Sequence, residues 1–578
     1  MKQNDRDHKQ VSACAGAARP SARIKQQAYV AGRRHVLPLA IAGALSLGVQ
    51  TDAEAQVFPP VINLGNLSQG EGFRLDGAAA DDYSGRSVTS AGDVNGDGID
   101  DLIVGARNAD PNGISGAGSS YVVFGKDTAT DGDFAQTVNL GGLDGSDGFR
   151  LDGVAAYDGS GRPVAGAGDI NGDGFSDLIV GAFSADPNGN DYAGSSYVVF
   201  GKGTPFAASI ALSSLDGSNG FRLDGAAADD EFGYSVAPAG DINGDGIDDL
   251  VAGAFRADPD GTNVAGSSYV VFGKTTSFAA SLSVSSLDGG NGFRIDGAAA
   301  GDYSGYSVAV AGDINGDGID DLTIGAPGAD PGTTYSGGSA YVVFGTTTPF
   351  AATLELVNLD GSNGFRLDAE ASNDLAGTSV AGAGDVNGDG INDLIIGAPN
   401  AAPNDIEEAG SSYVLFGKDT ATQGQFPAAL ALSELNGSNG FRLDGDLGDN
   451  AGTAVARAGD INGDGLGDMI IGAVDASPNG NIFAGSSFVV FGRSESFPAV
   501  LELTSLNGSD GFRLDGAAAL DFSGEAVSAA GDVNSDGVDD VIVGAFFADP
   551  NGNNNAGSSY VVFGRGGDLV FVDGFEAL

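Results

Sequence analysis

The chain has 578 residues, with 26 Lys and Arg against 78 Asp and Glu, which gives a formal net charge of −52. A charge of this sign argues against nucleic acids and anionic lipid surfaces as partners, because proteins bind both through basic patches, and it attracts cations. Hydrophobic residues make up 42% of the chain, so we expect a folded protein rather than a disordered one.

The N-terminus has the features of a secretory signal peptide. Basic residues precede the apolar run "VLPLAIAGALSLGV" at 36–49, and Ala53-Glu54-Ala55 supplies small residues for cleavage before Gln56. The run is shorter than the ~20 residues that a membrane span needs, although an uncleaved anchor is the alternative. The sequence therefore predicts export by the Sec or Tat route to a secreted or cell-surface location, with no membrane insertion of the mature chain.

Removal of residues 1–55 would change the chemistry available to the chain. The segment holds 8 Lys and Arg and 4 Asp and Glu, so 18 basic and 74 acidic residues remain, and Cys14, His8 and His35 are lost with it. A chain without Cys or His forms no disulfide, thiolate nucleophile, His-dependent triad or His/Cys zinc site. We therefore expect a protein that is not an enzyme.

A unit of 72 to 76 residues occurs seven times. Its most constant part is an acidic loop, written "GDVNGDGIDD" at 92–101 in the first copy. In the unit that contains the third loop, β-branched and aromatic residues bounded by Gly, Asp, Asn and Pro predict strands at 235–241, 249–254, 267–273 and 292–296. No stretch has a sustained helical period.

Seven units of four strands predict an all-β fold, a seven-bladed β-propeller of four-stranded antiparallel blades. A linear β-solenoid is the alternative, but its coils are usually ~20–30 residues long. The first fourth-strand copy, "GFRLDG" at 72–77, precedes the first complete blade, whereas the last blade ends at 558–564 without one. We expect the N-terminal strand to complete the last blade and close the ring, with "LVFVDGF" at 569–575 as a competitor.

Three segments follow from these assignments. They are the signal peptide at 1–55, the propeller at 56–564 and a short C-terminal tail at 565–578. The tail is either a sorting tag or an edge strand, and the sequence does not decide between them.

Each acidic loop places side-chain oxygens at positions 1, 3, 5 and 9, counted from its first Asp, with Gly at position 6 and a backbone carbonyl available at position 7. Ca²⁺ takes 6–8 oxygen ligands, and alternate residues of a tight loop converge on one point. An EF-hand is excluded because position 12, Val104 in the first copy, is apolar. We expect up to seven Ca²⁺ ions. Mg²⁺ prefers more water ligands, and Asx-type turns without metal are the structural alternative.

The predicted ligands of the seven loops are Asp93, Asn95, Asp97, Ile99, Asp101, Asp169, Asn171, Asp173, Phe175, Asp177, Asp241, Asn243, Asp245, Ile247, Asp249, Asp313, Asn315, Asp317, Ile319, Asp321, Asp385, Asn387, Asp389, Ile391, Asp393, Asp460, Asn462, Asp464, Leu466, Asp468, Asp532, Asn534, Asp536, Val538 and Asp540.

Two further motifs frame the loop. Phe-Gly ends every blade, from 124–125 to 563–564, and Gly-Ala-Pro follows the second strand at 325–327 and 397–399. With D-x-N-x-D-G-x-x-D between them, residues 57–564 resemble the FG-GAP repeats of the integrin α-subunit propeller. The resemblance implies seven blades, calcium in the loops between first and second strands, ligand binding on the opposite face and, in some members, cell adhesion.

We therefore expect a monomeric, secreted, calcium-binding propeller that acts in adhesion or binds an extracellular protein or glycan. One alternative is a carbohydrate-binding lectin. Another is a hydrolase-associated protein, since FG-GAP repeats also occur beside a phospholipase catalytic domain. The identity of the ligand and the affinity of each calcium loop stay open.

Two sets of side chains are candidates for function outside the loops. The first set lies in connections on the opposite face, where the alternative is packing between blades: Tyr83, Tyr157, Tyr192, Phe232, Tyr234, Tyr303, Tyr306 and Tyr335. The second set is one Arg in each fourth strand, where strand alternation favours pairing with neighbouring carboxylates over an anion-binding ring: Arg74, Arg150, Arg222, Arg294, Arg366, Arg442 and Arg513.

Overall fold

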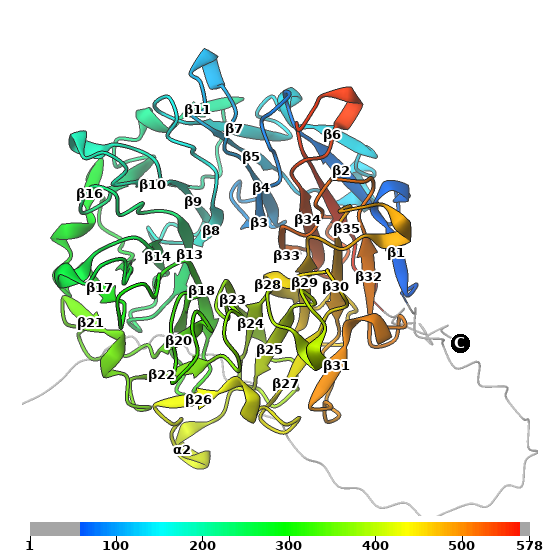
Figure 1. The fold of residues 1–578 in the computed structure, drawn as a ribbon. Coiled ribbons are helices and arrows are strands. Elements are labelled where there is room, and N and C mark those ends of the chain that lie inside the picture. Colours follow the sequence, from blue (N-terminus) through cyan, green and yellow to red (C-terminus); the bar gives the residue numbers. More distant parts are fainter. Residues whose placement is uncertain (1–57, 567–578) are drawn as a thin grey trace, which may run out of the picture. The chain divides into compact units, whose positions relative to one another are not determined.

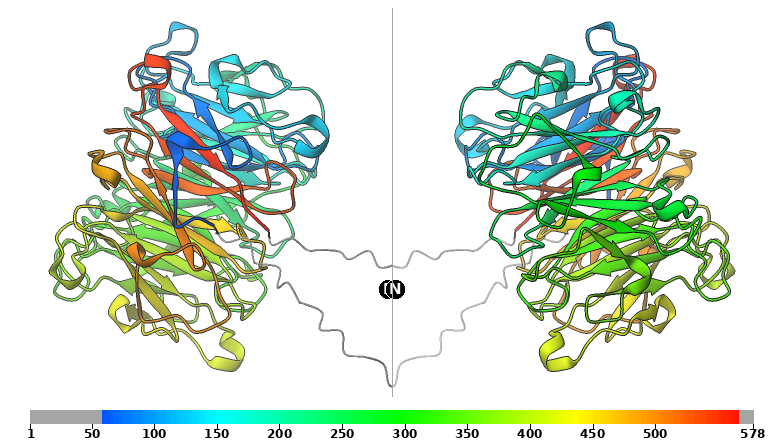
Figure 2. Two further views of the ribbon diagram at one scale, coloured as in Figure 1. Left: turned by 90° about the vertical axis from the view of Figure 1, so that its right-hand side faces the viewer. Right: turned by 90° about the vertical axis from the view of Figure 1, so that its left-hand side faces the viewer.

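The structure is a computed structural model that describes residues 58–566. These residues form seven sheets arranged radially around an axis, which is the predicted seven-bladed propeller (Figure 1, and from two sides in Figure 2). The predicted signal peptide and the segment 569–575 lie outside the described residues.

Every blade has the same strand order from the axis outward. The innermost strands are β3 (Ser87–Gly92), β8 (Val164–Gly168), β13 (Ser235–Gly240), β18 (Ser307–Gly312), β23 (Ser379–Gly384), β28 (Ala451–Gly459) and β33 (Ala526–Gly531). The second strands are β4 (Asp101–Ala106), β9 (Asp177–Ala182), β14 (Asp249–Ala254), β19 (Asp321–Ala326), β24 (Asp393–Ala398), β29 (Asp468–Ala473) and β34 (Asp540–Ala545). The third strands are β5 (Ser119–Val123), β10 (Ser195–Val199), β15 (Ser267–Val271), β20 (Ser339–Val343), β25 (Ser411–Leu415), β30 (Ser486–Val490) and β35 (Ser558–Val562).

Two outer positions complete each blade. The fourth strands are β7 (Gly148–Asp152), β12 (Gly220–Asp224), β17 (Gly292–Asp296), β22 (Gly364–Asp368), β27 (Gly440–Asp444), β32 (Gly511–Asp515) and β2 (Gly72–Asp76). The fifth strands are β11 (Ser209–Ala211), β16 (Ser281–Ser283), β21 (Thr353–Glu355), β26 (Ala429–Ala431), β31 (Val500–Glu502), β1 (Val61–Asn63) and β6 (Thr137–Asn139). We number the blades 1 to 7 in this order.

Short turns connect the strands. Two four-residue helices, α1 (Thr128–Asp131) and α2 (Thr420–Gln423), lie between third and fifth strands. Single 3₁₀ turns follow the fifth strands: η1 (Leu64–Asn66), η3 (Leu140–Gly142), η5 (Leu212–Ser214), η7 (Val284–Ser286), η8 (Leu356–Asn358), η10 (Leu432–Glu434) and η12 (Leu503–Ser505). Others begin with Pro between second and third strands: η2 (Pro111–Gly113), η4 (Pro187–Gly189), η6 (Pro259–Gly261), η9 (Pro403–Asp405), η11 (Pro478–Gly480) and η13 (Pro550–Gly552).

The four predicted strands of the third unit are confirmed as β13, β14, β15 and β17; the first is one residue shorter than expected and the third is two residues shorter. The fifth strand of each blade was not predicted. It has three residues, comes from the following repeat and pairs in parallel, as β21 does with β17 through Arg294 and Thr353. A three-residue segment shows no readable alternation, which is why the sequence did not reveal it.

The predicted closure of the ring is confirmed. Strand β2 pairs antiparallel with β35, where Gly72 faces Val562 and Asp76 faces Ser558. A second N-terminal strand, β1, pairs in parallel with β32 of blade 6. The N-terminal segment therefore contributes to two blades, and it occupies the edge for which 569–575 was the competitor.

The hydrophobic core lies between neighbouring blades. All residues of the second and third strands are buried, because these strands are covered on both faces. One core cluster, for example, joins Phe73 and Val561 of blade 7 to Val88, Leu102 and Tyr121 of blade 1. A blade thus completes its core only against its neighbours.

Three Phe side chains pack together in the outer part of each blade. One comes from the fourth strand and stacks on a second, which precedes the fifth strand, with ring centroids 4.1–4.4 Å apart. The Phe of the Phe-Gly motif tilts against both; Phe563 lies 5.8 Å from Phe73 and 6.3 Å from Phe134. The stacked pairs are Phe73–Phe134, Phe149–Phe206, Phe221–Phe278, Phe293–Phe350, Phe365–Phe426, Phe441–Phe497 and Phe512–Phe58.

A buried carboxyl group anchors each connection between blades. Asp302 is 5% exposed, and its side chain accepts the backbone N–H of Ala299 at 2.9 Å. Burial, with a smaller contribution from the charge of Asp330, raises the pKa of Asp302 to about 6, while the hydrogen bond from Ala299 and the charge of Arg366 oppose the shift. Asp82, Asp230, Asp449 and Asp521 share this raised pKa of about 6.

Replacement of Phe73 by Ala should weaken ring closure. Phe73 is 1% exposed and stacked, and loss of a buried Phe costs about 3–5 kcal/mol. We expect calorimetry to show a clearly lower melting temperature. Val357→Ala is the control, because Val357 is 66% exposed; equal melting of both variants and the wild type would contradict the closure role of Phe73.

Replacement of Asp302 by Asn should flatten part of the pH dependence of stability. The pKa of Asp302 is higher in the folded state than in the unfolded state. Protonated Asp302 therefore favours the folded state, fully below the unfolded pKa, and this stabilisation is lost as pH rises through about 6. At pH 7 we expect Asp302→Asn to be more stable than the wild type by about 2 kcal/mol, and the gap to close at pH 4. The measurement is melting at fixed calcium from pH 4 to 8, with the exposed Asp191→Asn as control. Parallel curves for Asp302→Asn and the wild type would refute the prediction.

Candidate metal centres

Each acidic loop joins the first strand of a blade to the second and folds through hydrogen bonds to its own carboxylates. The Asp93 side chain accepts the N–H groups of Gly96 at 2.6 Å, Asp97 at 3.1 Å and Gly98 at 2.8 Å. Gly98 has φ +88°, a left-handed conformation that Gly adopts without strain. At position 4 six of the loops have Gly, as at Gly96, and the seventh has Ser535, which also takes a left-handed conformation with φ 60°. The first half of the loop is therefore already ordered by its own carboxylates.

The Asp at position 9 lies beneath the loop. Asp101 is completely buried and accepts the N–H of Val94 at 3.0 Å and of Gly125 at 2.9 Å. Gly125 belongs to the Phe-Gly motif, and the equivalent bond recurs in all seven blades at 2.8–2.9 Å. A side chain at Gly125 would bring its Cβ within 2.3 Å of the Asp100 carbonyl oxygen. The Phe-Gly motif therefore keeps its glycine in every blade for a steric reason.

Burial makes the ionised form of this Asp costly. Burial, together with the charges of Asp97 and Asp93, raises the pKa of Asp101 to about 8, although the hydrogen bonds from Gly125 and Val94 oppose the shift. Asp177, Asp249, Asp393 and Asp468 have the same raised pKa of about 8, and that of Asp321 and Asp540 is also well above its ordinary value. Within residues 58–566, the ion pairs involve none of the loop carboxylates. The loops therefore hold negative charge that no basic side chain balances.

The oxygen-only donor set suits Ca²⁺, but the three carboxylates of a loop are not gathered tightly. They do not all lie within 4.8 Å of one another, and the Asn171 amide nitrogen points at Asp177, at 3.1 Å. Coordination would require the loop to contract and the Asn to turn its oxygen inward. The predicted ligand residues are thus brought into one turn, and their coordination stays a prediction.

Loop position 8 was missed by the sequence reasoning. In four junctions it is an Asp whose carboxylate accepts the N–H of the first loop Asp in the preceding blade: Asp248 from Asp169, Asp320 from Asp241, Asp539 from Asp460 and Asp100 from Asp532, at 2.8–3.1 Å. In the other three, the backbone N–H of Ser176, Asn392 or Gly467 donates to the carbonyl of that Asp, at 2.9–3.2 Å. Every acidic loop is therefore bonded to the next, and repeated Asp at this position was the available signal.

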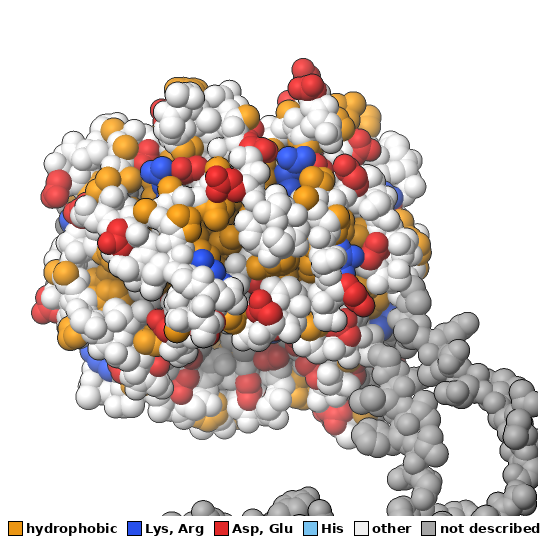
Figure 3. Space-filling view, turned by 90° about the horizontal axis from the view of Figure 1, so that it is seen from below, with side chains coloured by type: hydrophobic (Ala, Val, Ile, Leu, Met, Phe, Trp, Pro, Cys, Tyr) orange, Lys and Arg blue, Asp and Glu red, His pale blue; other side chains and the backbone are white. Residues whose placement is uncertain are grey.

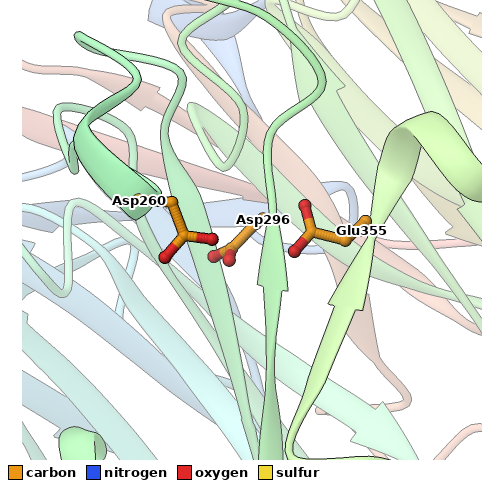
Figure 4. Close-up of side chains that lie close together, drawn as sticks. All are labelled: Asp260, Asp296 and Glu355. Atoms are coloured by element: carbon orange, nitrogen blue, oxygen red, sulfur yellow. The ribbon is translucent and has the colours of Figure 1, made fainter.

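One group of three carboxylates meets closely within the described residues, at the outer edge of blade 3 (Figure 4). It consists of Asp260 in η6, Asp296 in β17 and Glu355 in β21. Asp296 accepts the Ser267 hydroxyl at 2.9 Å and Arg294 at 2.6 Å. Five other blades have Asn at the position of Asp260, and in four of them that Asn donates to the Asp equivalent to Asp296. The trio is thus a local variation on a structural hydrogen bond, and an acidic cluster alone does not define a site.

The expected Arg pairing is confirmed. Each fourth-strand Arg binds the Asp two residues later on the same strand face, for example Arg442 with Asp444 at 2.7 Å and Arg513 with Asp515 at 2.6 Å. The same pair occurs in the other blades. These guanidinium groups are therefore already paired with carboxylates of the protein itself.

The aromatic candidates on the opposite face divide into two groups. Tyr157, Tyr192 and Tyr335 are 74%, 54% and 69% exposed. Phe232 is completely buried against Tyr269, so its prediction as a ligand contact is wrong; the connection folds its side chain into the core. Tyr83, Tyr234 and Tyr306 are half-buried and pack against other rings, and Tyr303 is exposed. Exposed aromatic rings remain in blades 2 and 4.

Comparison with known proteins identifies the repeats. The FG-GAP repeat family matches residues 84–123, 163–199, 232–271, 304–343, 376–415 and 523–562, one segment in every blade except the sixth. Integrin alpha pat-2 of Caenorhabditis briggsae is 29% identical over 292 residues, which cover 48% of this chain and 21% of that protein. Integrin alpha-V of Gallus gallus is 31% identical over 258 residues, which cover 44% and 21%.

A third relative is not named as an integrin. The phosphatidylinositol-glycan-specific phospholipase D of Dictyostelium discoideum is 30% identical over 181 residues, 29% of this chain and 18% of that protein. The chain thus spans only 18–21% of the length of these three relatives. Within residues 58–566, none of the helices has the length and hydropathy of a bilayer span. The repeats, the seven blades and these relatives show that the chain is an FG-GAP repeat protein that resembles the integrin α-subunits.

Proposed function

We propose that this protein is an exported, non-enzymatic propeller that binds Ca²⁺ in its acidic loops and an extracellular protein or glycan on the opposite face. Its integrin-α-like repeats support a role in ligand binding of the adhesion type. The observation that carries the calcium assignment is the buried Asp at position 9, whose charge lacks a basic partner in residues 58–566.

In each loop the Asp residues at positions 1, 5 and 9, the Asn at position 3 and the carbonyl at position 7 would hold the ion. A bound divalent cation would supply positive charge next to carboxylates that repel one another and would favour their ionised form. The chain's own residues order the first half of the loop and aim the backbone N–H groups at Asp93 and Asp101. The role of the metal in this proposal is structural.

A hydrolase function is supported less well. The relative named as a phospholipase D matches 29% of this chain and 18% of its own length. The surface shown in Figure 3 has acidic side chains scattered among uncharged ones, with few basic groups. The clustered carboxylates of the described residues lie in the acidic loops or at the outer edge of blade 3. None of these observations favours catalysis over binding.

Export should remove the N-terminal segment. We expect the protein recovered outside the producing cell to begin at Gln56, because Ala53-Glu54-Ala55 provides the cleavage site. Intact-mass measurement of the exported protein tests this. A protein that stays in the membrane fraction with residues 1–55 attached would contradict the secretory part of the proposal.

Removal of calcium should destabilise the propeller. A ligand bound only by the native state adds about 2.7 kcal/mol per site at a hundredfold excess over its dissociation constant, so loss of several ions should lower the melting temperature by roughly 10 °C or more. The measurement is calorimetry in excess calcium and in excess chelator. Mg²⁺ at equal concentration should restore less of the loss.

A loop variant separates specific binding from general charge effects. Asp245→Asn keeps an oxygen that can accept the Ile247 N–H, as Asp245 does at 3.1 Å, but removes one ligand charge. Equilibrium dialysis should then find one calcium ion fewer per chain, whereas the exposed Asp191→Asn should leave the stoichiometry unchanged. Identical melting with and without chelator would show that the calcium proposal is wrong.

A further inference from the structure

The connections that enter the innermost strands, opposite the acidic loops, carry an uneven charge. Shortly before the innermost strand, blades 1 and 2 have Arg86 and Arg162, whereas blades 3 and 4 have Tyr234 and Tyr306. The residue after the second strand is Arg107 in blade 1, where other blades have Phe, Pro or Val. Three of the few basic residues thus gather over blades 1 and 2 of a chain with a net charge of −52.

Two of these guanidinium groups have partners within the protein. Arg86 binds Glu525 at 3.0 Å and lies 4.5 Å from the centre of the Phe546 ring. Arg162 lies 3.6 Å from the centre of the Tyr234 ring and donates to its hydroxyl at 2.6 Å. These contacts hold the two side chains in place.

Arg107 is different. Within residues 58–566 it takes part in no ion pair, and its Nε is shielded from solvent without a hydrogen-bond partner. Burial, followed by the charges of Arg86 and Arg162, lowers its pKa. A guanidinium offers five donors in a fork that matches a carboxylate. Arg107 is therefore a basic residue without an anionic partner among the described residues, and its side chain lines a cavity.

Arg107 lines a cavity of about 740 Å³ at the junction of blades 1 and 2, and Tyr157 lines it as well. Tyr157 is 74% exposed and has φ 67°, a left-handed conformation. The equivalent residues of other blades include Asp81, Asp229 and Asn373, types that tolerate this conformation better than Tyr, and Leu520, which does not. The connection therefore places the Tyr157 ring outward, at the edge of the cavity.

We propose that this cavity binds a sugar that carries a carboxylate, such as a hexuronate of an extracellular glycan, with the carboxylate on Arg107 and the pyranose ring against Tyr157. The remaining lining includes Asn108, Ser115 and Ser184, which suit sugar hydroxyl groups, and Asp81 and Asp110, which accept hydrogen bonds from them. The same two carboxylates disfavour an acidic peptide, because it would bring more negative charge against them. The inference rests on the proposed function, since it names a ligand class for the opposite face.

The test is calorimetric titration of the calcium-loaded full chain with trigalacturonate and with its methyl ester. The two probes have the same sugar rings, and only the first has free carboxylates. We expect the wild type to bind the acid at least about tenfold more tightly than the ester, since a charge-assisted hydrogen bond contributes this much.

Two variants assign the contacts. Arg107→Gln should lower the affinity for the acid about tenfold and leave that for the ester unchanged, whereas Tyr157→Ala should weaken both. Arg256→Gln is the matched control, because Arg256 sits in blade 3 one position after the equivalent of Arg107 and is 51% exposed in its pair with Glu231. Melting temperatures confirm that each variant is folded.

The inference is overturned if the folded, calcium-loaded wild type binds neither probe, if ester and acid bind equally, or if folded Arg107→Gln binds the acid as tightly as the wild type. Equal binding of hexaglutamate and trigalacturonate would overturn the sugar assignment. Failure of the calcium proposal is seen separately, as melting that does not respond to chelator.

Discussion

A carboxylate buried beneath each acidic loop is the interaction on which the propeller depends. Asp101 and its six equivalents accept the N–H of the Phe-Gly glycine, and so tie the loop between the first two strands to the end of the third. The Phe before that glycine tilts against the stacked Phe pair at the outer edge. One repeated arrangement therefore connects the loop, the strands and the aromatic core. The charge that it buries is also the reason to place a cation there.

Neighbouring blades depend on one another on two levels. Their hydrophobic clusters are shared between adjacent sheets, so a single blade without its neighbours would expose core residues. Their acidic loops are bonded in sequence through position 8, by a carboxylate in four junctions and by a backbone N–H in three. An ion in one loop would thus order residues that contact the next loop. Stability in such an array includes interface contributions as well as those of the repeats.

Much of the fold was readable because the chain repeats it seven times. The strand spans, the closure by β2 and the Arg–Asp pairs followed from alternation and from the phase of the repeat. The three-residue fifth strands did not, because their pairing is decided by the Phe stack that brings them alongside the blade. Phe232 was misplaced because local polarity suggested an exposed connection, while the fold turns that side chain inward. The candidate loop ligands could be named from spacing alone, but spacing does not fix how closely their oxygens approach one another, and the structure does not bring the three carboxylates of a loop within 4.8 Å of one another. Arg107 could not be singled out from the sequence, because its role follows from the cavity that it lines together with residues of blade 2.

The pairing of β1 with β32 and of β2 with β35 sets an order on assembly. Val61 of β1 can pair only after Arg513 of β32 has been synthesised, and Gly72 of β2 can pair only after Val562 of β35. A chain that crosses a membrane N-terminus first would therefore hold its leading strands unpaired during nearly the whole passage, beside blades that already present open edges. Contacts between the two ends of a chain are the slowest to form. The last blade to emerge is thus the one that converts a row of sheets into a closed ring, and a chain cut short before residue 558 would leave both ends free to join another copy.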